Sequence, residues 1–273
     1  MKIAALQMLS TPDVAENLAA ARALVAEAAA GGAELAVLPE YFCIMGRSDR
    51  DKLGVAETVG EGPIQRMLAE AAKEHSLWLV GGTLPLAIAG RTDRVSNTNL
   101  VFSPAGEQVA RYDKMHLFRY DNGREQYDEG RTLEAGNAPV AFTAGALRVG
   151  LSVCYDLRFP ELYRALMQPP CDLLSVPAAF TFPTGQAHWE LLLRARAVEN
   201  QCYVVAAAQG GTHANGRRTF GHSLIVDPWG EVVAMRSEEG AGVVMAEISA
   251  ERIASVRSQL PALEHRRRFP SNP

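Results

Sequence analysis

The sequence predicts an α/β protein folded as a four-layer αββα sandwich, in which two mixed β-sheets stack face to face and helices cover both outer faces. The second half of the chain repeats the order of strands and helices expected in the first. Each half also contains a hairpin with the pattern polar–Pro–x–Gly–Glu–x–Val–Ala, at residues 103–110 and 227–234. Such repetition favours two related halves, each with one sheet and helices on one face. We expect residues 1–273 to form a single domain.

The first half begins with a buried strand at residues 2–8. Asp13, with Glu16 three residues later, predicts the start of a helix that ends at the Gly31-Gly32 pair. Pro63 suits the first turn of a second helix, which we expect to reach about residue 75. Short apolar runs bounded by turn residues predict the other strands, at 34–38, 77–83, 97–103 and 107–112.

The second half follows the same order. Pro160 opens a helix that we expect to end near residue 167, and a longer helix is expected at 186–200. A hairpin is centred on the Pro228-Trp229-Gly230 turn. The predicted strands of this half are 147–154, 172–176, 202–208, 223–227, 231–235 and 243–248.

The composition resembles that of an average globular protein, with 48% apolar and 21% charged residues and a net charge of −4. A mildly acidic chain has no general attraction to nucleic acid or to anionic membranes. No apolar run approaches the roughly 18 residues of a membrane span, and the first residues do not resemble a secretory leader. We therefore expect a cytoplasmic protein that binds neither nucleic acid nor membrane.

The four cysteines form no Cys-x-x-Cys pair, and the histidines match no zinc-binding spacing. We therefore expect no bound metal and no organic cofactor. Three of the cysteines are expected to be small packing residues. Cys154 stands apart, because it ends an apolar strand and precedes a helix, where α/β sheets place their ligands. An inert buried thiol remains the alternative interpretation of this position.

Two charged residues also follow predicted strands. Glu40 comes directly after the strand that ends at Leu38, and Lys114 follows the strand that ends at Tyr112. Each can be an ordinary surface residue. If their strands are neighbours, a thiol, a carboxylate and an ammonium meet at one sheet edge.

Such a trio suits nucleophilic attack on a carbonyl carbon. A cation beside the thiol would lower its pKa, and the carboxylate would accept its proton and later activate water. The ammonium would stabilise the developing oxyanion, and the backbone N–H of Tyr155 is a candidate second donor.

At this point the sequence resembles the nitrilase, or carbon–nitrogen hydrolase, superfamily. The resemblance lies in Leu38-Pro39-Glu40, in the segment 112–118 (YDKMHLF) and in the segment 151–162 (LSVCYDLRFPEL). It extends through 185–190 (GQAHWE) and Gly221-His222-Ser223, and so covers essentially the whole chain. The family fold is the αββα sandwich, and its members dimerise or form larger assemblies. We therefore expect at least a homodimer, which the apolar helix around Leu191, Leu192 and Leu193 also favours.

The resemblance assigns the catalytic roles to Glu40, Lys114 and Cys154. A further family glutamate positions the substrate, and Glu129, in the local sequence EGRTL, fits that pattern better than Glu125. The loop from Arg119 to Tyr127 departs from animal members of the family, and we expect it to border the pocket. The expected substrate-binding residues are Tyr155, Arg158, Phe180 and Thr184.

The segments 154–162 and 186–190 are most similar to the branch that contains ω-amidase and deaminated glutathione amidase. This implies a hydrolase that releases ammonia from a small, carboxylate-bearing linear amide, similar to deaminated glutathione, through a cysteine thioester. Its only expected partners are that amide, water and copies of itself. The alternatives are an ω-amidase acting on 2-oxoglutaramate or 2-oxosuccinamate, a carbamoylase and a nitrilase.

Arg158 would bind the substrate carboxylate, unless it pairs structurally with Asp156 or Glu161. His116 and His188 are expected to support the fold and the site. Two other classes remain open on the sequence: a Cys-His amidotransferase or protease, and a non-enzymatic binding scaffold on the same fold.

Overall fold

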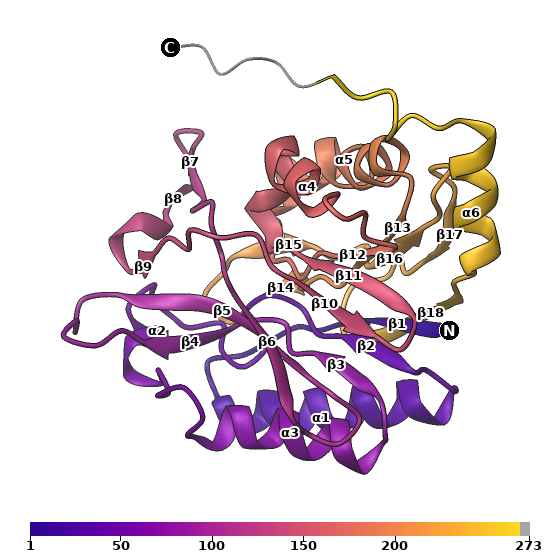
Figure 1. Ribbon diagram of the computed structural model, residues 1–273. Helices are drawn as coiled ribbons and strands as arrows, with labels where there is room; N and C mark the ends of the chain where they lie inside the picture. Colours follow the sequence, from indigo (N-terminus) through magenta and orange to yellow (C-terminus); the bar gives the residue numbers. More distant parts are fainter. Residues whose placement is uncertain (268–273) are drawn as a thin grey trace.

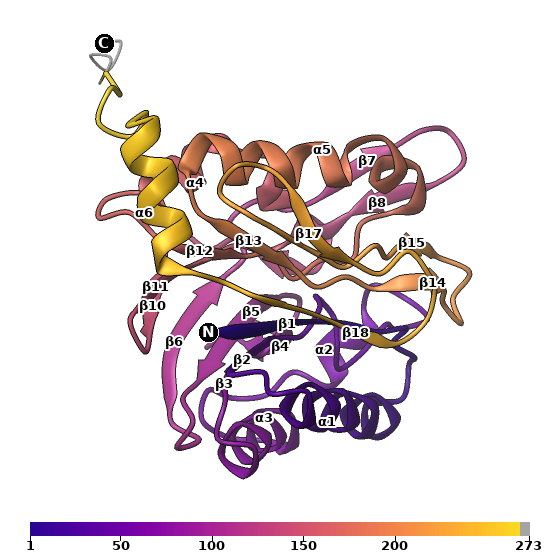
Figure 2. The same cartoon turned by 90° about the vertical axis from the view of Figure 1, so that its right-hand side faces the viewer.

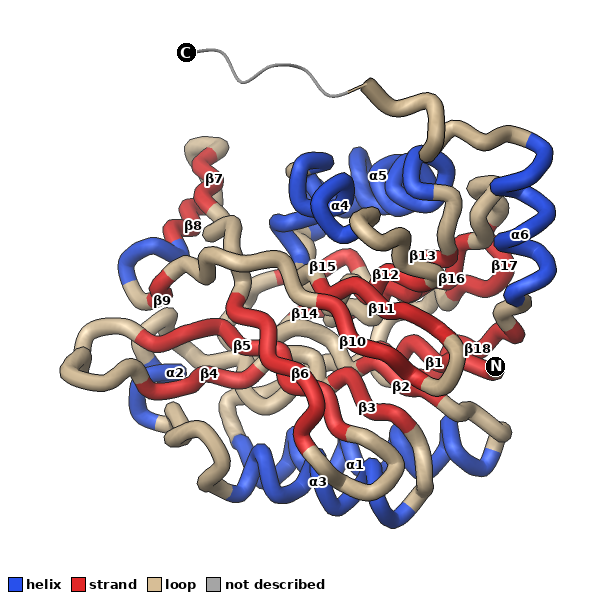
Figure 3. The backbone as a smooth tube through the Cα atoms, in the orientation of Figure 1, coloured by secondary structure: helices blue, strands red, loops and turns tan. Residues whose placement is uncertain are grey.

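Two β-sheets lie face to face in the computed structural model, which describes residues 1–267, and helices cover their outer faces (Figure 1). Figure 3 shows the four layers in order: helices α1 and α3, the first sheet, the second sheet, and helices α4 and α5. This arrangement is the predicted αββα sandwich.

The first sheet has the strand order β18-β1-β2-β3-β5-β4, and β6 and β9 also pair with β5. Strands β1, β2 and β3 are parallel, whereas β18 runs antiparallel to β1 and β5 runs antiparallel to β3. The strands are β1 (Lys2–Gln7), β2 (Leu35–Val37), β3 (Trp78–Val80), β4 (Leu84–Ala87), β5 (Val95–Phe102), β6 (Gln108–Asp113), β9 (Leu133–Glu134) and β18 (Gly242–Glu247).

The second sheet has the order β10-β11-β12-β13-β16-β17, with β11, β12 and β13 parallel. Its strands are β10 (Ala141–Ala144), β11 (Leu147–Leu151), β12 (Leu173–Ser175), β13 (Tyr203–Ala206), β16 (Leu224–Val226) and β17 (Val232–Met235). Two separate two-stranded pairs complete the β-structure: β7 (Arg119–Asp121) with β8 (Gln126–Asp128), and β14 (Gly210–Thr212) with β15 (Arg218–Phe220).

Capping residues set the ends of the longer helices. The Asp13 carboxylate accepts the N–H of Glu16 at the start of α1, as predicted. Helix α5 begins at Phe182, four residues before the predicted start, because Pro183 fits its first turn. The helices are α1 (Val14–Ala30), α2 (Asp51–Gly54), α3 (Pro63–Glu74), α4 (Pro160–Leu166), α5 (Phe182–Asn200) and α6 (Ala250–Gln259), with short 3₁₀ helices at Glu129–Arg131 and Cys154–Arg158.

Alternate side chains along the central strands enter two different cores. In β1, Ile3 and Ala5 pack between the sheets, whereas Ala4 and Leu6 pack with the apolar side chains of α1 and α3. Successive strand residues point to opposite faces, so a strand covered on both sides needs apolar side chains at every position. This burial explains why the strand runs are continuously apolar rather than alternating.

The final strand crosses from one half to the other. Residues 243–248 were expected to extend the second half, but β18 pairs antiparallel with β1 in the first sheet over six register positions. Figure 2 shows β18 lying beside β1 at the interface between the halves. The pairing covers the otherwise open edge of β1. The two halves are therefore joined through this strand as well as through the core between the sheets.

The outer surface of α5 bears on the expected oligomer. Leu193 is fully buried in the core, whereas Leu191 is 67% exposed on the outer surface of the helix. An exposed leucine can still be covered by a second copy, and assembly stays a prediction. Within residues 1–267, no helix is long and apolar enough to cross a membrane.

Candidate active site

Glu40 lies at the end of β2, in a backbone environment that fixes its position. Gly82 packs so closely behind this turn that a Cβ atom there would lie 2.2 Å from the Pro39 carbonyl oxygen. The Glu40 carboxylate is buried and accepts two hydrogen bonds here. Its Oε1 accepts one from Asn97 Nδ2 at 2.9 Å, and its Oε2 accepts one from the Ala179 N–H at 3.0 Å. Both halves of the chain therefore hold this carboxylate.

Lys114 stands directly after β6 and is fully buried. Its backbone N–H donates to the Asn97 carbonyl oxygen, which ties it to the residue that also holds Glu40. The ammonium Nζ donates to Glu40 Oε1 at 2.9 Å and to both Glu129 oxygens, at 3.0 and 2.7 Å. One buried cation is therefore shared by two carboxylates.

Cys154 lies three residues beyond the end of β11, at the first position of a 3₁₀ helix. Its φ angle is +48°, which is unfavourable for a residue with a Cβ atom. The N–H of Cys154 donates to the Pro177 carbonyl at 2.9 Å, and this bond holds the turn. Strain of this kind is concentrated at functional sites, where it presents a side chain that a relaxed turn would not.

The structure brings these residues together in a way the sequence did not predict. From the sequence, the three residues would meet at one sheet edge if their strands were neighbours. Instead, β2 and β6 are separated in the first sheet by β3 and β5, and β11 belongs to the second sheet. The long side chain of Lys114 reaches Glu40 across this arrangement. The residues therefore converge where the two stacked sheets meet.

The charges of the site favour a neutral thiol in the resting state. Burial, followed by the charge of Glu40, raises the pKa of Cys154 well above its ordinary value, and Lys114 offsets this only in part. The expectation of a lowered thiol pKa is therefore wrong, because a thiolate would be a third negative charge beside one ammonium. The thiol needs a base to accept its proton as it reacts.

Lys114 and Glu129 stay charged. Burial lowers the pKa of Lys114 more than any other single influence, but Glu129 and Glu40 together outweigh it and raise that pKa. Burial likewise favours a neutral Glu129, yet Lys114 keeps its pKa below the ordinary value. The ion pair is therefore expected to persist at neutral pH, whereas either partner alone would be an uncompensated buried charge.

Glu129, rather than Glu125, contacts the buried lysine. Tyr41 Oη donates to Glu129 Oε1 at 2.7 Å, and the Phe118 N–H donates to Oε2 at 2.7 Å. Glu125 lies in the turn between β7 and β8, where it accepts a hydrogen bond from Tyr127 Oη at 3.4 Å. Figure 1 shows this hairpin rising away from both sheets.

A small cavity at Cys154 gathers the four predicted substrate-binding residues. It has a volume of about 10 Å³, enough for about one water molecule. No histidine occurs among the described residues that line it, which argues against a Cys-His enzyme. The lining consists of Phe118, Glu129, Cys154, Tyr155, Arg158, Ala179, Phe180, Thr181, Thr184 and Arg217.

Arg158 lines this cavity, and its guanidinium is not held by a carboxylate of the described chain. Its guanidinium lies 5.2 Å from the ring centre of Phe180, and Nη1 is 3.3 Å from His188 Nδ1. Within residues 1–267 it forms no ion pair with Asp156, Glu161 or any other carboxylate. A guanidinium without a carboxylate partner is available to bind an anion in a bidentate manner.

Asp156 instead supports the turn at Cys154. It accepts hydrogen bonds from Tyr112 Oη at 2.7 Å, from the Val153 N–H at 2.8 Å and from the His116 N–H at 3.0 Å. His116 Nδ1 also lies 2.7 Å from Asp156, in line with the expected supporting role. These bonds link the end of β6 to the turn that carries the cysteine.

Several residues at the site were missed from the sequence. Asn97, Tyr41 and Arg217 were not singled out, although Asn97 interrupts a fully buried strand and Tyr41 directly follows Glu40. A buried amide inside a strand requires a partner, and this requirement was the available signal. Arg217 lies in a Gly-Arg-Arg segment whose composition is typical of an exposed turn, so the sequence gives no indication that it reaches the site.

The sequence was then compared with known families and proteins. The sequence model of the carbon–nitrogen hydrolase family matches residues 2–258. This chain is a carbon–nitrogen hydrolase. Deaminated glutathione amidase from Synechocystis sp. (strain PCC 6803 / GT-S) is 42% identical over 266 residues, which cover 96% of this chain and 97% of that protein.

Solved structures show the same relationship. Nit3 of Saccharomyces cerevisiae, a member of branch 10 of the nitrilase superfamily, superposes with a TM-score of 0.87 at 31% identity, covering 96% of this chain and 94% of that one. A glutamate-to-glutamine mutant of an amidase from Nesterenkonia sp. AN1, with acrylamide added to its active-site cysteine, superposes with a TM-score of 0.79 at 26% sequence identity. The match covers 96% of this chain and 98% of that one. The carbon–nitrogen hydrolase described here is therefore an enzyme that cleaves amides.

Proposed function

We propose that this carbon–nitrogen hydrolase cleaves small linear amides whose acyl part carries a carboxylate, through a thioester on Cys154. The observation that carries the proposal is the buried Lys114, shared by Glu40 and Glu129 beside a cysteine in a strained turn. Nucleophile, base and oxyanion donor are all required for acyl transfer, and each has a candidate here.

In the proposed reaction, Glu40 accepts the thiol proton of Cys154 as sulfur attacks the amide carbon. Lys114 Nζ and the Tyr155 N–H stabilise the negative charge on the former carbonyl oxygen. Glu40 then gives the proton to the amide nitrogen, the carbon–nitrogen bond breaks, and ammonia or an amine leaves. Water, deprotonated by Glu40, attacks the thioester; carbon–sulfur cleavage releases the acid, and the proton returns to Cys154.

The Glu40 carboxylate has the capacity for this role. It accepts three hydrogen bonds, from Asn97 Nδ2, Lys114 Nζ and the Ala179 N–H. A carboxylate can accept about four. One acceptor position therefore remains for the thiol proton or for water. Because the resting thiol is neutral, transfer to Glu40 during the attack avoids an additional buried charge.

The acyl carboxylate is assigned to Arg158, with Phe180 and Thr184 lining the same cavity. Deaminated glutathione, the substrate named for the relative, is such an amide. Its amide nitrogen beside the oxo acid carries a cysteinylglycine group, so hydrolysis there releases a dipeptide, whereas a primary amide releases ammonia. The assay must detect both products.

The substrate test is a comparison of kcat/KM on deaminated glutathione, 2-oxoglutaramate, 2-oxosuccinamate and an aliphatic nitrile. We expect the carboxylate-bearing amides to be hydrolysed far faster than the nitrile. A preference for the two primary amides would favour the ω-amidase alternative. Turnover of the nitrile alone would refute the proposed substrate class.

Replacing Arg158 by lysine tests the carboxylate assignment. Lysine keeps the charge but loses the planar fork, and a lost charge-assisted contact of about 1.5–3 kcal/mol lowers kcat/KM roughly ten- to a hundredfold. The loss is expected for carboxylate-bearing amides and much less for a neutral aliphatic amide. A variant with an unchanged preference and an unchanged melting curve would contradict the role of Arg158.

A further inference from the structure

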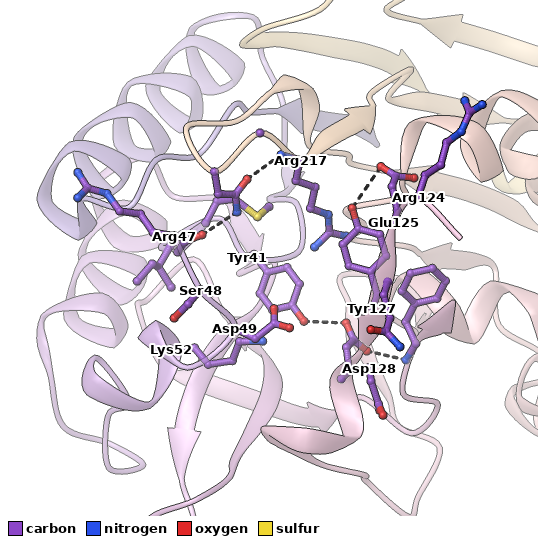
Figure 4. A pocket seen from close by; sticks show the side chains of 18 residues that line it. Tyr41, Arg47, Ser48, Asp49, Lys52, Arg124, Glu125, Tyr127, Asp128 and Arg217 are labelled. Atoms are coloured by element: carbon purple, nitrogen blue, oxygen red, sulfur yellow. Dashed lines mark hydrogen bonds between the residues drawn. The ribbon is translucent and has the colours of Figure 1, made fainter. Parts of the chain in front are cut away.

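A second and larger cavity opens beside the one at Cys154. It has a volume of about 460 Å³ and shares Phe118, Glu129 and Arg217 with the small cavity. Its walls come from three segments: the residues after β2, the β7–β8 hairpin and the turn between β14 and β15 (Figure 4). We call this space the vestibule. Its shared walls make it the adjoining space for the part of a substrate that extends beyond Cys154.

Two cations point into the vestibule without a carboxylate partner. Arg217 Nη2 donates to the Ala179 carbonyl at 2.7 Å, and its Nε is buried without a hydrogen-bond partner. Lys52 Nζ lies 5.1 Å from the ring centre of Tyr41. Among residues 1–267, neither cation forms an ion pair. Figure 4 shows both side chains directed toward the space around Tyr41 and Tyr127.

The acidic residues of the vestibule do not neutralise these cations. Glu129 is held by Lys114, and Asp128 lies 3.6 Å from Arg131. Asp49 is exposed at the rim. Burial lowers the pKa of Lys52 despite the opposing influence of Glu129 and Asp49. An anion bound between Lys52 and Arg217 would therefore offset the cost of burying the Lys52 ammonium.

Glu125 restricts what kind of anion fits. Its Oε2 is buried without a hydrogen-bond partner, on the same hairpin as Tyr127. A free carboxylate oxygen accepts hydrogen bonds and repels a second carboxylate. The vestibule therefore suits a group with a single carboxylate and an additional N–H or other donor.

We propose that the vestibule binds the amine half of the substrate, and that Arg217 and Lys52 hold a carboxylate on that amine. The inference rests on the proposed function, in which Arg158 holds the acyl half. The scissile bond then lies at Cys154, between the two cavities. The preferred substrates are then amides of carboxylate-bearing amines, such as amino acids or short peptides. A primary amide has no group that would occupy the vestibule.

A matched pair of substrates tests this assignment. The 2-oxoglutaryl amide of glycine and the 2-oxoglutaryl amide of glycinamide share the acyl half and differ only in the carboxylate of the amine. We expect the wild-type enzyme to prefer the free carboxylate at least tenfold in kcat/KM, since a charge-assisted contact of this kind is worth about that factor or more. Equal rates on the two amides would overturn the inference.

Variants locate the contact. Arg217→Gln is expected to reduce the ratio of the two kcat/KM values to near one, and Lys52→Met to reduce it severalfold. Arg66→Gln, which removes an exposed cation on α3 outside both cavities, serves as the control and should keep the wild-type ratio. Unchanged ratios in both variants would refute the role of these cations, and a melting curve accompanies each. If Arg217→Gln does not fold, the ratio in Lys52→Met decides.

The outcomes separate this inference from the proposed function. Hydrolysis of 2-oxoglutaramate and of both glycine derivatives without preference would leave the proposed function intact and remove the vestibule assignment. Hydrolysis of none of these amides would refute the proposed function itself. A preference for the glycinamide derivative would show that the vestibule excludes anions, and would also overturn the inference.

Discussion

Cys154→Ala is expected to abolish amide turnover while the protein stays folded. Without the thiol no thioester forms, and we expect kcat to fall at least about 10⁴-fold, as for loss of a nucleophile in other hydrolases. Alanine occupies the strained φ of +48° as well as cysteine does, so the melting temperature should change little. The measurement is kcat on the best carboxylate-bearing amide, together with a thermal melt.

Cys202→Ala is the matched control, because Cys202 is equally deep in the core but far from the chemistry. It should keep kcat near the wild-type value. Mass spectrometry after treatment with an amide-like electrophile should place the adduct on Cys154. A plain alkylating agent should react slowly at pH 7, since the pKa of this thiol is raised. Near-normal turnover by Cys154→Ala, or an adduct on Cys43, would remove the nucleophile assignment.

Lys114→Met is expected to abolish activity and to destabilise the protein. The substitution leaves two buried carboxylates, Glu40 and Glu129, without their shared cation. Breaking a buried ion pair from one side costs about 3–5 kcal/mol in the free energy of unfolding. Urea denaturation should reveal this loss at pH 7. Lys73→Met, at an exposed position in α3, should change the unfolding free energy by less than about 0.5 kcal/mol.

The pH dependence of the Lys114→Met deficit has a definite sign. In the wild type the pKa of Glu129 is below the ordinary value for a glutamate. Its contribution to stability is therefore present above that ordinary pKa and is lost as the pH falls through the lowered one. Without Lys114, burial raises this pKa, and the ionised form opposes folding. The deficit should therefore be largest at neutral pH and should shrink as the pH falls, first through the raised pKa of Glu129 in the variant and then below the ordinary glutamate pKa of about 4.3. A deficit that grows in acid would contradict the shared-cation arrangement.

A double variant isolates the interaction between the two residues. Adding Glu129→Gln to Lys114→Met removes one of the two uncompensated charges, and it should recover part of the lost stability without recovering activity. If the double variant is less stable than the sum of the two single variants predicts, Lys114 and Glu129 do not stabilise each other as proposed.

The layered architecture could be predicted because it follows from local patterns. Continuous apolar runs such as 35–38 indicate strands covered on both faces, and Asp13 and Pro63 mark helix starts through capping and fixed φ. The short pairs β7–β8 and β14–β15 were not predicted. They are only three residues long and contain few apolar residues, so hydrophobic periodicity and strand propensity carry little information about them.

The sequence by itself determined most strands of the two sheets, the main helices, the family and the strand-end residues Glu40, Lys114 and Cys154. Each depends on order along the chain or on a short motif, and folding does not change these. The tertiary structure decided how the residues meet: between two stacked sheets, with Ala179 of one half bound to Glu40 of the other.

Tertiary structure also decided the charges. The sequence predicted an activated thiol because it placed a lysine near a cysteine. The fold brings two carboxylates to that lysine and removes water, and both changes raise the pKa of Cys154. It likewise carries Arg217 from a surface-like turn to the wall shared by two cavities. Electrostatic energies depend on distance and burial in three dimensions, and neither can be deduced from spacing along a chain.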